Sequence, residues 1–205
     1  MAEDGTWPSI SEHGLKSTVA LLDFLEVPPN ERDAIERNIR RNSVRINGAV
    51  GTAVIRDQKP LFRSALVKCL VGMTPEEWCW ELNRRVFFWP AEERVLRLLM
   101  AKAYRDRHHC VLTVNTRNLL EKMWNAVHIS PINSGSTLYR AQPRGAFTFR
   151  HISTYRAHET SHPKLTVAEV AVDYSVPTLH SMVIRVERRR ADEAPEVIFE
   201  HRNHR

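Results

Sequence analysis

One acidic side chain lies inside an otherwise apolar run of the sequence. In Val167-Ala168-Glu169-Val170-Ala171-Val172, every residue except Glu169 is apolar. Such a run predicts a strand that is buried on both faces. A carboxylate there is unfavourable unless it is paired or faces a cleft, so Glu169 is a candidate catalytic residue. The alternative is a glutamate on the solvent side of a half-exposed strand.

A basic, irregular segment precedes this strand. Residues 140 to 164 are rich in Arg, His, Pro and Gly and have little periodicity. A loop that leads into a catalytic strand commonly carries substrate contacts, although an ordinary basic surface loop has the same composition. The candidate substrate-binding residues in it are Arg144, Arg150, Tyr155, Arg156 and His158.

Two further segments carry hydrogen-bonding groups at the ends of expected strands. Asn133-Ser134-Gly135-Ser136-Thr137 offers backbone N–H groups and hydroxyls that could bind a phosphate or an amide. Arg56-Asp57-Gln58-Lys59-Pro60 places a cation, an acid and an amide together. Neither segment matches a P-loop or a GxGxxG motif, and a plain turn is the alternative for both. The aromatic run Phe87-Phe88-Trp89 could form a wall for a flat ring or belong to the core.

The sequence favours neither a metal site nor several other kinds of catalysis. The cysteines Cys69, Cys79 and Cys110 form no CxxC pair. His108 and His109 adjoin Cys110, so the three side chains cannot all converge on one ion, and we expect surface histidines before a strand. No GxSxG, HExxH, kinase-like or EF-hand pattern is present.

The composition is that of a folded protein with a basic surface. Of the 205 residues, 42% are hydrophobic and 26% are charged, which suits an ordinary core. The formal net charge of +6 and the pI near 9.5 favour a polyanionic partner or a phosphate-bearing cofactor. No apolar run approaches the roughly 20 residues of a membrane span, and no signal peptide is recognisable. These features predict a cytoplasmic protein.

Helical patterns dominate the first half of the chain and strand patterns the second half, which predicts an α+β fold. We expect one domain over residues 1–190 and a charged, partly loose tail over residues 191–205. Thr74-Pro75-Glu76-Glu77 is a strong helix start, with a Thr cap, Pro at the first position and Glu three residues on. Helices are expected at 7–14, 19–25, 31–41, 61–70, from 75, at 92–104 and after Thr116; strands are expected at 51–57, 85–89, 110–114, 128–132, 167–172 and 183–187.

Three segments together resemble a known family. The opening Trp7-Pro8-Ser9-Ile10-Ser11-Glu12-His13-Gly14-Leu15-Lys16-Ser17-Thr18 resembles the start of DarT-like ADP-ribosyltransferases. Residues 85 to 89 resemble that family's second conserved strand, and residues 167 to 172 followed by Val176-Pro177 resemble its A-E-V-x-V…V-P element. The chain also resembles an uncharacterised bacterial family marked by residues 53–60, 83–89 and 130–137.

The resemblance implies a split β-sheet core with a helical N-terminal part, and NAD as co-substrate. Glu169 would be catalytic together with Arg56, by stabilising the positive ribose formed when the nicotinamide bond breaks. One preorganised group of this kind is worth about 3–4 kcal/mol in the transition state. Arg56 or Arg85 would pair with the pyrophosphate. The resemblance places the family's first motif, a strand ending in an NAD-contacting histidine, upstream of Met1. The implied cofactor-binding residues are Trp7, Gly14, Leu15, Ser17, Thr18, Arg85, Phe88, Ser134, Ser136 and Thr137.

The expected acceptor of ADP-ribose is a base of DNA or RNA, as the basic balance and the DarT-like resemblance both indicate. Two alternatives remain open at this point. The same enzyme could modify a protein, a small molecule or water, or the chain could be an inactive basic module that binds nucleic acid. A toxin of this type would have an antitoxin or a hydrolase as partner.

Overall fold

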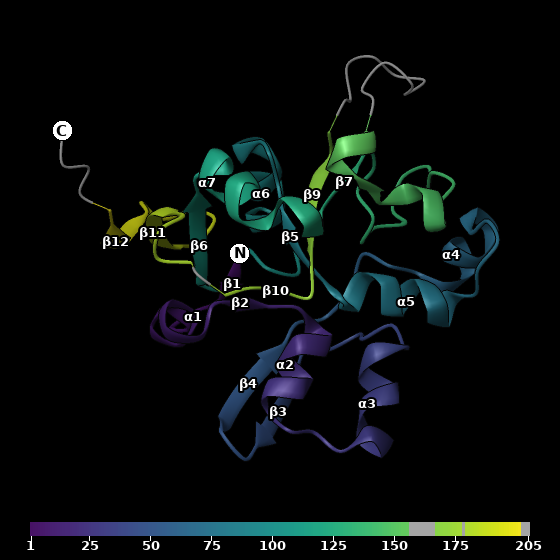
Figure 1. The fold of residues 1–205 in the computed structure, drawn as a ribbon, viewed down its shortest axis with the longest axis horizontal. Helices are drawn as coiled ribbons and strands as arrows, with labels where there is room; N and C mark the ends of the chain where they lie inside the picture. Colours follow the sequence, from purple (N-terminus) through teal and green to yellow (C-terminus); the bar gives the residue numbers. More distant parts are fainter. Residues whose placement is uncertain (156–166, 178, 202–205) are drawn as a thin grey trace. The chain divides into compact units, whose positions relative to one another are not determined.

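The computed structural model describes residues 1–155, 167–177 and 179–201 (Figure 1). The chain divides into two compact units that alternate along the sequence. The first unit contains Met1–Leu15, Ala91–Trp124 and Val176–Arg205, and the second contains Lys16–Pro90 and Asn125–Ser175. The single domain expected over residues 1–190 stays a prediction.

The α+β class is confirmed, because the described residues form seven α-helices and several antiparallel sheets. Most of the expected helices and strands are present, with ends shifted by a few residues. Three short 3-10 turns occur as well, η1 (Trp124–Ala126), η2 (Ala146–Thr148) and η3 (Ile152–Thr154). The strands β2 (Leu15–Lys16) and β10 (Ser175–Val176) lie where the chain passes from one unit to the other.

The first unit contains a four-stranded sheet in the order β1-β6-β11-β12, and each neighbouring pair is antiparallel. Its strands are β1 (Ala2–Glu3), β6 (His109–Val114), β11 (Val183–Arg189) and β12 (Glu196–Glu200), and its helices are α1 (Trp7–His13), α6 (Glu92–Leu99) and α7 (Thr116–Met123).

The tail predicted over residues 191–205 contains the strand β12, which pairs with β11. Two expectations for this unit are wrong. The helix expected to reach Tyr104 ends at Leu99, and Tyr104 instead accepts a hydrogen bond from the ring of His109 at its carbonyl oxygen. His109 is therefore a buried residue of β6 and not a surface histidine.

The second unit contains a sheet in the order β5-β9-β7-β8, also antiparallel throughout, and the hairpin β3-β4. Its strands are β3 (Val44–Gly48), β4 (Gly51–Ile55), β5 (Arg85–Phe88), β7 (Val127–Ser130), β8 (Arg150–His151) and β9 (Glu169–Asp173), and its helices are α2 (Thr18–Phe24), α3 (Pro29–Glu36), α4 (Arg63–Cys69) and α5 (Pro75–Asn83).

The main core cluster of the second unit joins α4 and α5 to the sheet. Its fully buried members include Leu66 from α4, Trp78 from α5 and Ala171 from β9. The ring of Phe149 stacks on Trp78 with centroids 5.7 Å apart. The start of α5 is confirmed in detail, since Thr74 and Glu77 form the expected capping box. A rigid α5 thus holds Trp78 over the face of the sheet that carries Glu169.

Candidate functional site

Glu169 is the first residue of β9 and is only 4% exposed. Its Oε2 accepts a hydrogen bond from the backbone N–H of Ser134, with a distance of 3.1 Å. The expected buried strand is therefore confirmed, and a solvent-facing glutamate is excluded. A carboxylate held this way is oriented by the main chain, which is how a catalytic group is kept in one position.

The strand register determines which residues share a face with Glu169. Alternate residues of a strand point to the same face, so Glu169, Ala171 and Asp173 lie together. Opposite them are Ser130 of β7 and, from β5, Phe87. Phe88, which was predicted to bind the cofactor, pairs with Val170 and lies on the other face of the sheet from Glu169. Phe87 is the aromatic residue of β5 that shares the face of the carboxylate.

Arg144 is buried beneath the polar loop that follows β7. It is 1% exposed, and its Nη1 donates to the carbonyl oxygens of Ser134 and Ser136, both at 3.0 Å. Burial lowers the pKa of Arg144, while the nearby Cys69 and Glu169 side chains act in the opposite direction. Arg144 was predicted as a substrate contact in a surface loop. It holds the Ser134–Ser136 segment from inside, near Glu169.

Thr137 connects this loop to the segment that contains Arg56. Its backbone N–H donates to the carbonyl of Pro60 at 3.0 Å, and its hydroxyl accepts from the N–H of Phe62 at 2.8 Å. Arg56 directly follows β4, four residues before Pro60. The predicted residues Ser134, Ser136, Thr137 and Arg144 therefore form one bonded group with Glu169, to which the Arg56–Pro60 segment is attached.

A buried hydroxyl beside Glu169 has no hydrogen-bond partner among the described residues. Ser134 is 1% exposed, and its Oγ is unpaired in that part of the chain. The same residue supplies the N–H that binds Glu169. Leaving a buried hydroxyl unpaired costs about 1–3 kcal/mol, so this atom is a candidate contact for a ligand.

Arg85 takes part in a separate cluster of charges. Its guanidinium forms ion pairs with Glu81 and with Asp173, the latter at 3.0 Å, and lies 4.4 Å from the ring centre of Phe149. The imidazole of His128 is 3.7 Å from Asp173. The predicted pyrophosphate contact would have to separate Arg85 from two carboxylates.

Two of the implied cofactor residues in the second unit serve α2. The hydroxyl of Ser17 accepts from the N–H of Ala20 at 3.1 Å and caps the helix, and Thr18 is the first helical residue. Capping satisfies a donor that the helix itself leaves free. Both residues therefore have a structural role that requires no cofactor.

The other implied cofactor residues, Trp7, Gly14 and Leu15, belong to the first unit. Trp7 is buried, and its ring lies 5.2 Å from that of Phe199. Gly14 ends α1 with φ of 75°, and a Cβ on it would lie 2.4 Å from the carbonyl oxygen of Val176. Packing alone thus accounts for Trp7 and Gly14.

The remaining predicted substrate contacts are only partly described. Arg150 is exposed on β8, and Tyr155 is partly buried with a hydroxyl that has no partner among the described residues. Burial raises the pKa of Tyr155, so the phenol is protonated at neutral pH. Arg156 and His158 lie outside the described residues.

Some site residues escaped the sequence-based prediction. The sequence did not single out Arg40, whose guanidinium bonds the carbonyl of Arg56, or Asp173 and His128, which lie in the charged cluster around Arg85. Arg40 lies after α3 in a stretch that resembles an ordinary charged helix, so only its burial distinguishes it. Asp173 could have been found, because it follows Glu169 by four residues and alternation places both on one face.

Among residues 1–155, 167–177 and 179–201, no group of three or more His, Cys, Asp or Glu side chains could hold a metal ion. No helix within those ranges is both long and apolar enough to cross a bilayer.

A family described as "Family of unknown function (DUF7002)" matches residues 1–183 of the chain. Neither a curated protein nor a solved structure matches it.

Proposed function

The chain belongs to the DUF7002 family, and we propose that it is an NAD-dependent ADP-ribosyltransferase in which Glu169 is the catalytic carboxylate. The observation that carries the proposal is the buried carboxylate of Glu169, bound by the N–H of Ser134, a residue whose own hydroxyl is buried and has no partner in the part of the chain that the structure describes. The resemblance of the opening block, of β5 and of the β9 segment to DarT-like enzymes supports it. Two antiparallel sheets of four strands are consistent with an ADP-ribosyltransferase-like split sheet.

In the proposed reaction, the bond between nicotinamide and ribose breaks and positive charge develops on the ribose. The carboxylate of Glu169 accepts a hydrogen bond from a ribose hydroxyl and stabilises that charge. Nicotinamide leaves with the bonding electron pair, and a nucleophile of the acceptor then bonds to the ribose carbon and loses its proton. An ionised carboxylate can accept several hydrogen bonds, so Glu169 can bind a ribose hydroxyl while it keeps the bond from the Ser134 N–H. The Ser134 hydroxyl, which has no partner among the described residues, is the proposed second contact for the ligand.

Arg56 has the proposed role of binding the pyrophosphate of NAD. A guanidinium presents a fork of donors that suits phosphate oxygens. The segment that carries Arg56 is bonded through Pro60 to Thr137, in the same loop as Ser134. The cofactor NAD is abundant in the cytoplasm, which is the proposed location.

A base of DNA or RNA is the proposed acceptor, and an exposed aromatic and basic surface near this loop supports it. Tyr139 is 96% exposed and follows Thr137 by two residues. Phe62, also exposed, binds Thr137 through its backbone, and the guanidinium of Arg41 lies 4.9 Å from its ring centre. Exposed rings flanked by cations suit unpaired bases and their phosphates.

The test of the enzyme is NAD cleavage and labelling of single-stranded DNA or RNA by purified protein. Glu169→Gln keeps the side-chain volume and an oxygen acceptor, and it should reduce turnover by about 100-fold or more. Glu187→Gln, a buried glutamate of β11, is the matched control and should retain activity. If the wild-type protein neither cleaves NAD nor labels DNA or RNA, the proposal is refuted.

The rival functions give different results in the same assays. Labelling of a protein band that survives nuclease treatment would indicate a protein acceptor. An inactive module would bind nucleic acid in a salt-sensitive way, with no NAD turnover and no effect of Glu169→Gln. Tyr139→Ala should weaken nucleic-acid binding if the protein is an inactive module. If the protein is the enzyme, the same change should weaken nucleic-acid labelling without slowing NAD cleavage.

A further inference from the structure

We infer that Arg40 is a positioning residue, which fixes the main chain at Arg56 and Gln58 so that Arg56 can bind the cofactor. The inference deepens the proposed function and rests on it for the role of Arg56. Whether Arg40 holds the Arg56–Pro60 segment in place can be tested separately, without an assay of NAD turnover.

Arg40 binds this segment through both its main chain and its side chain. Its carbonyl oxygen accepts from the N–H of Gln58 at 2.7 Å, and its own N–H donates to the Gln58 amide oxygen at 3.2 Å. Its Nε donates to the carbonyl oxygen of Arg56 at 3.1 Å. Three hydrogen bonds from one residue thus define the path of the chain over Arg56 to Gln58.

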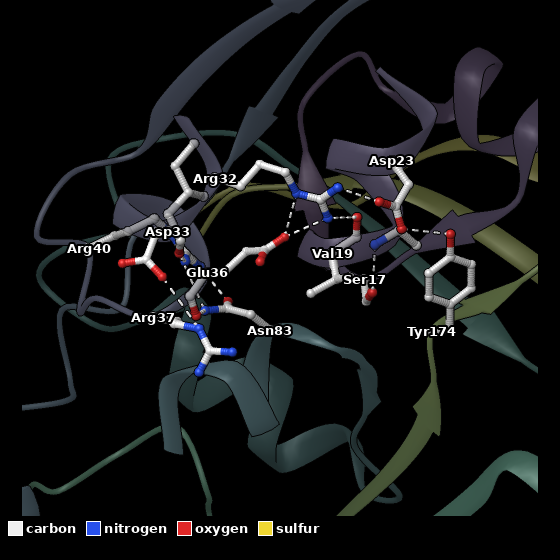
Figure 2. Close-up of polar contacts among 12 residues, drawn as sticks. Ser17, Val19, Asp23, Arg32, Asp33, Glu36, Arg37, Arg40, Asn83 and Tyr174 are labelled. Carbon is white, nitrogen blue, oxygen red and sulfur yellow. Dashed lines mark hydrogen bonds and ion pairs between the residues drawn. The ribbon is translucent and has the colours of Figure 1, made fainter. Parts of the chain in front are cut away.

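The other end of the Arg40 side chain is anchored to two helices. Nη1 donates to the carbonyl of Ile35 in α3, and Nη2 donates to the amide oxygen of Asn83 in α5 at 3.0 Å. Asn83 in turn donates to the carbonyl of Glu36 at 2.7 Å. Figure 2 shows Arg40 and Asn83 among these contacts. Arg40 therefore ties the Arg56–Pro60 segment to the ends of α3 and α5.

The burial of Arg40 indicates that these contacts are specific. The residue is 8% exposed, and its hydrogen-bond acceptors are two carbonyl oxygens and an amide oxygen, all uncharged. Burial lowers the pKa of Arg40 to about 10, while the nearby Cys79 and Asp57 side chains act in the opposite direction, so the guanidinium remains charged at neutral pH. A buried charge is unfavourable unless its donors are satisfied, and only the guanidinium fork reaches three acceptors at once.

The main-chain position of the Arg56–Pro60 segment fixes the Cα of Arg56, from which its side chain extends toward the cofactor in the proposed function. A displacement of about 1 Å in a substrate-positioning group can reduce turnover by about 100-fold. The Arg40 side chain bonds the carbonyl of Arg56 itself, so its loss acts on Arg56 directly. Arg40 does not need to touch NAD for this effect.

The test compares Arg40→Lys with Arg32→Lys. Arg32 is a second arginine of the same region, and it bonds Asp23, Glu36 and the carbonyl of Val19 (Figure 2). Both changes remove a guanidinium fork, yet only Arg40 contacts the Arg56–Pro60 segment. Amide hydrogen exchange at residues 56–59 should speed up at least 10-fold in Arg40→Lys and stay unchanged in Arg32→Lys.

Turnover provides the second readout. Arg40→Lys should lower kcat/KM for NAD about 10- to 100-fold, mainly through KM, whereas Arg32→Lys should lose activity only in proportion to unfolding. In an Arg56→Ala background, Arg40→Lys should cause no further loss, since the two residues act in series. Independent, multiplying losses would overturn the inference.

The failure of the inference differs from the failure of the proposed function. If the wild-type protein does not turn over NAD, the proposed function fails, and the exchange experiment still decides whether Arg40 fixes the segment. Unchanged amide exchange at residues 56–59 in Arg40→Lys would overturn the inference even in an active enzyme. Melting curves of both variants identify any loss that is due to unfolding alone.

Discussion

Replacing Gly14 by alanine should strongly destabilise the first unit. Gly14 has φ of 75° and ψ of −179°, a combination that is essentially confined to glycine. An added Cβ would also lie 2.4 Å from the carbonyl oxygen of Val176 and 2.8 Å from Cα of Pro177. Both obstacles are main-chain atoms, which cannot move aside as a flexible side chain could.

The size of the effect follows from these two contributions. The backbone conformation contributes about 1–3 kcal/mol for a residue other than glycine. Overpacking against fixed atoms adds about 1–3 kcal/mol. We therefore expect the free energy of unfolding to fall by about 2–6 kcal/mol. In a chain of this size, each kcal/mol lowers Tm by about 2–4 °C, which gives a total of about 4–24 °C.

The assay is thermal and urea unfolding followed by circular dichroism, with Gly72→Ala as control. Gly72 also has positive φ, of 70°, but nothing lies within 4 Å of a Cβ placed there. The control therefore carries much of the backbone effect without the collision. Equal losses in the two variants would refute the close approach at Val176. A Gly14→Ala protein of normal stability that loses NAD binding would instead favour the cofactor role implied by the resemblance.

Three further predictions concern the second unit. Thr74→Ala removes one partner of the capping box and should lower the free energy of unfolding by about 1 kcal/mol in urea titrations, whereas no change would mean that α5 does not depend on its cap. Leu66→Ala, in the core, should lower it by about 2–5 kcal/mol, and the exposed Val67→Ala by about 0.5 kcal/mol or less, in the same titration. Burial lowers the pKa of His128, and the charge of Asp173 acts in the opposite direction. The imidazole therefore binds a proton more readily in the unfolded state than in the folded state. The protein should lose stability as the pH falls below about 6.5, the ordinary pKa of histidine. His128→Gln should reduce that loss in melting curves between pH 7 and pH 5, and an unchanged pH dependence would contradict the assignment.

Local patterns were sufficient to predict several elements. The capping signals before Pro75 and the isolated Glu169 were each read from a few adjacent residues, and the structure confirms a capped helix and a buried strand. The side of the sheet reached by Phe88 depends on its pairing with Val170, which is 82 positions away and leaves no local signal. For the same reason, the sequence could name the aromatic strand but not the ring that shares a face with Glu169.

Other features depend on long-range packing. The strand β3 begins at Val44 and alternates apolar and polar residues, but it lies in a stretch dominated by charge and was not predicted. Arg144 has the composition of a surface residue, and only the folding of the loop around it makes it a buried anchor. Burial of a charged side chain depends on partners that are distant in sequence, so local composition does not reveal it.

The alternation of the two units along the chain also bears on how the protein is made. The central strands of the first sheet are β6, which ends at Val114, and β11, which begins at Val183. A ribosome that adds about 5–20 residues per second therefore releases β11 roughly 3–14 s after β6. During that interval β6 can pair with β1, but its other edge lacks β11 and is open to pairing with other chains. Synthesis rate and chaperone supply, rather than final stability alone, should then determine the yield of native protein.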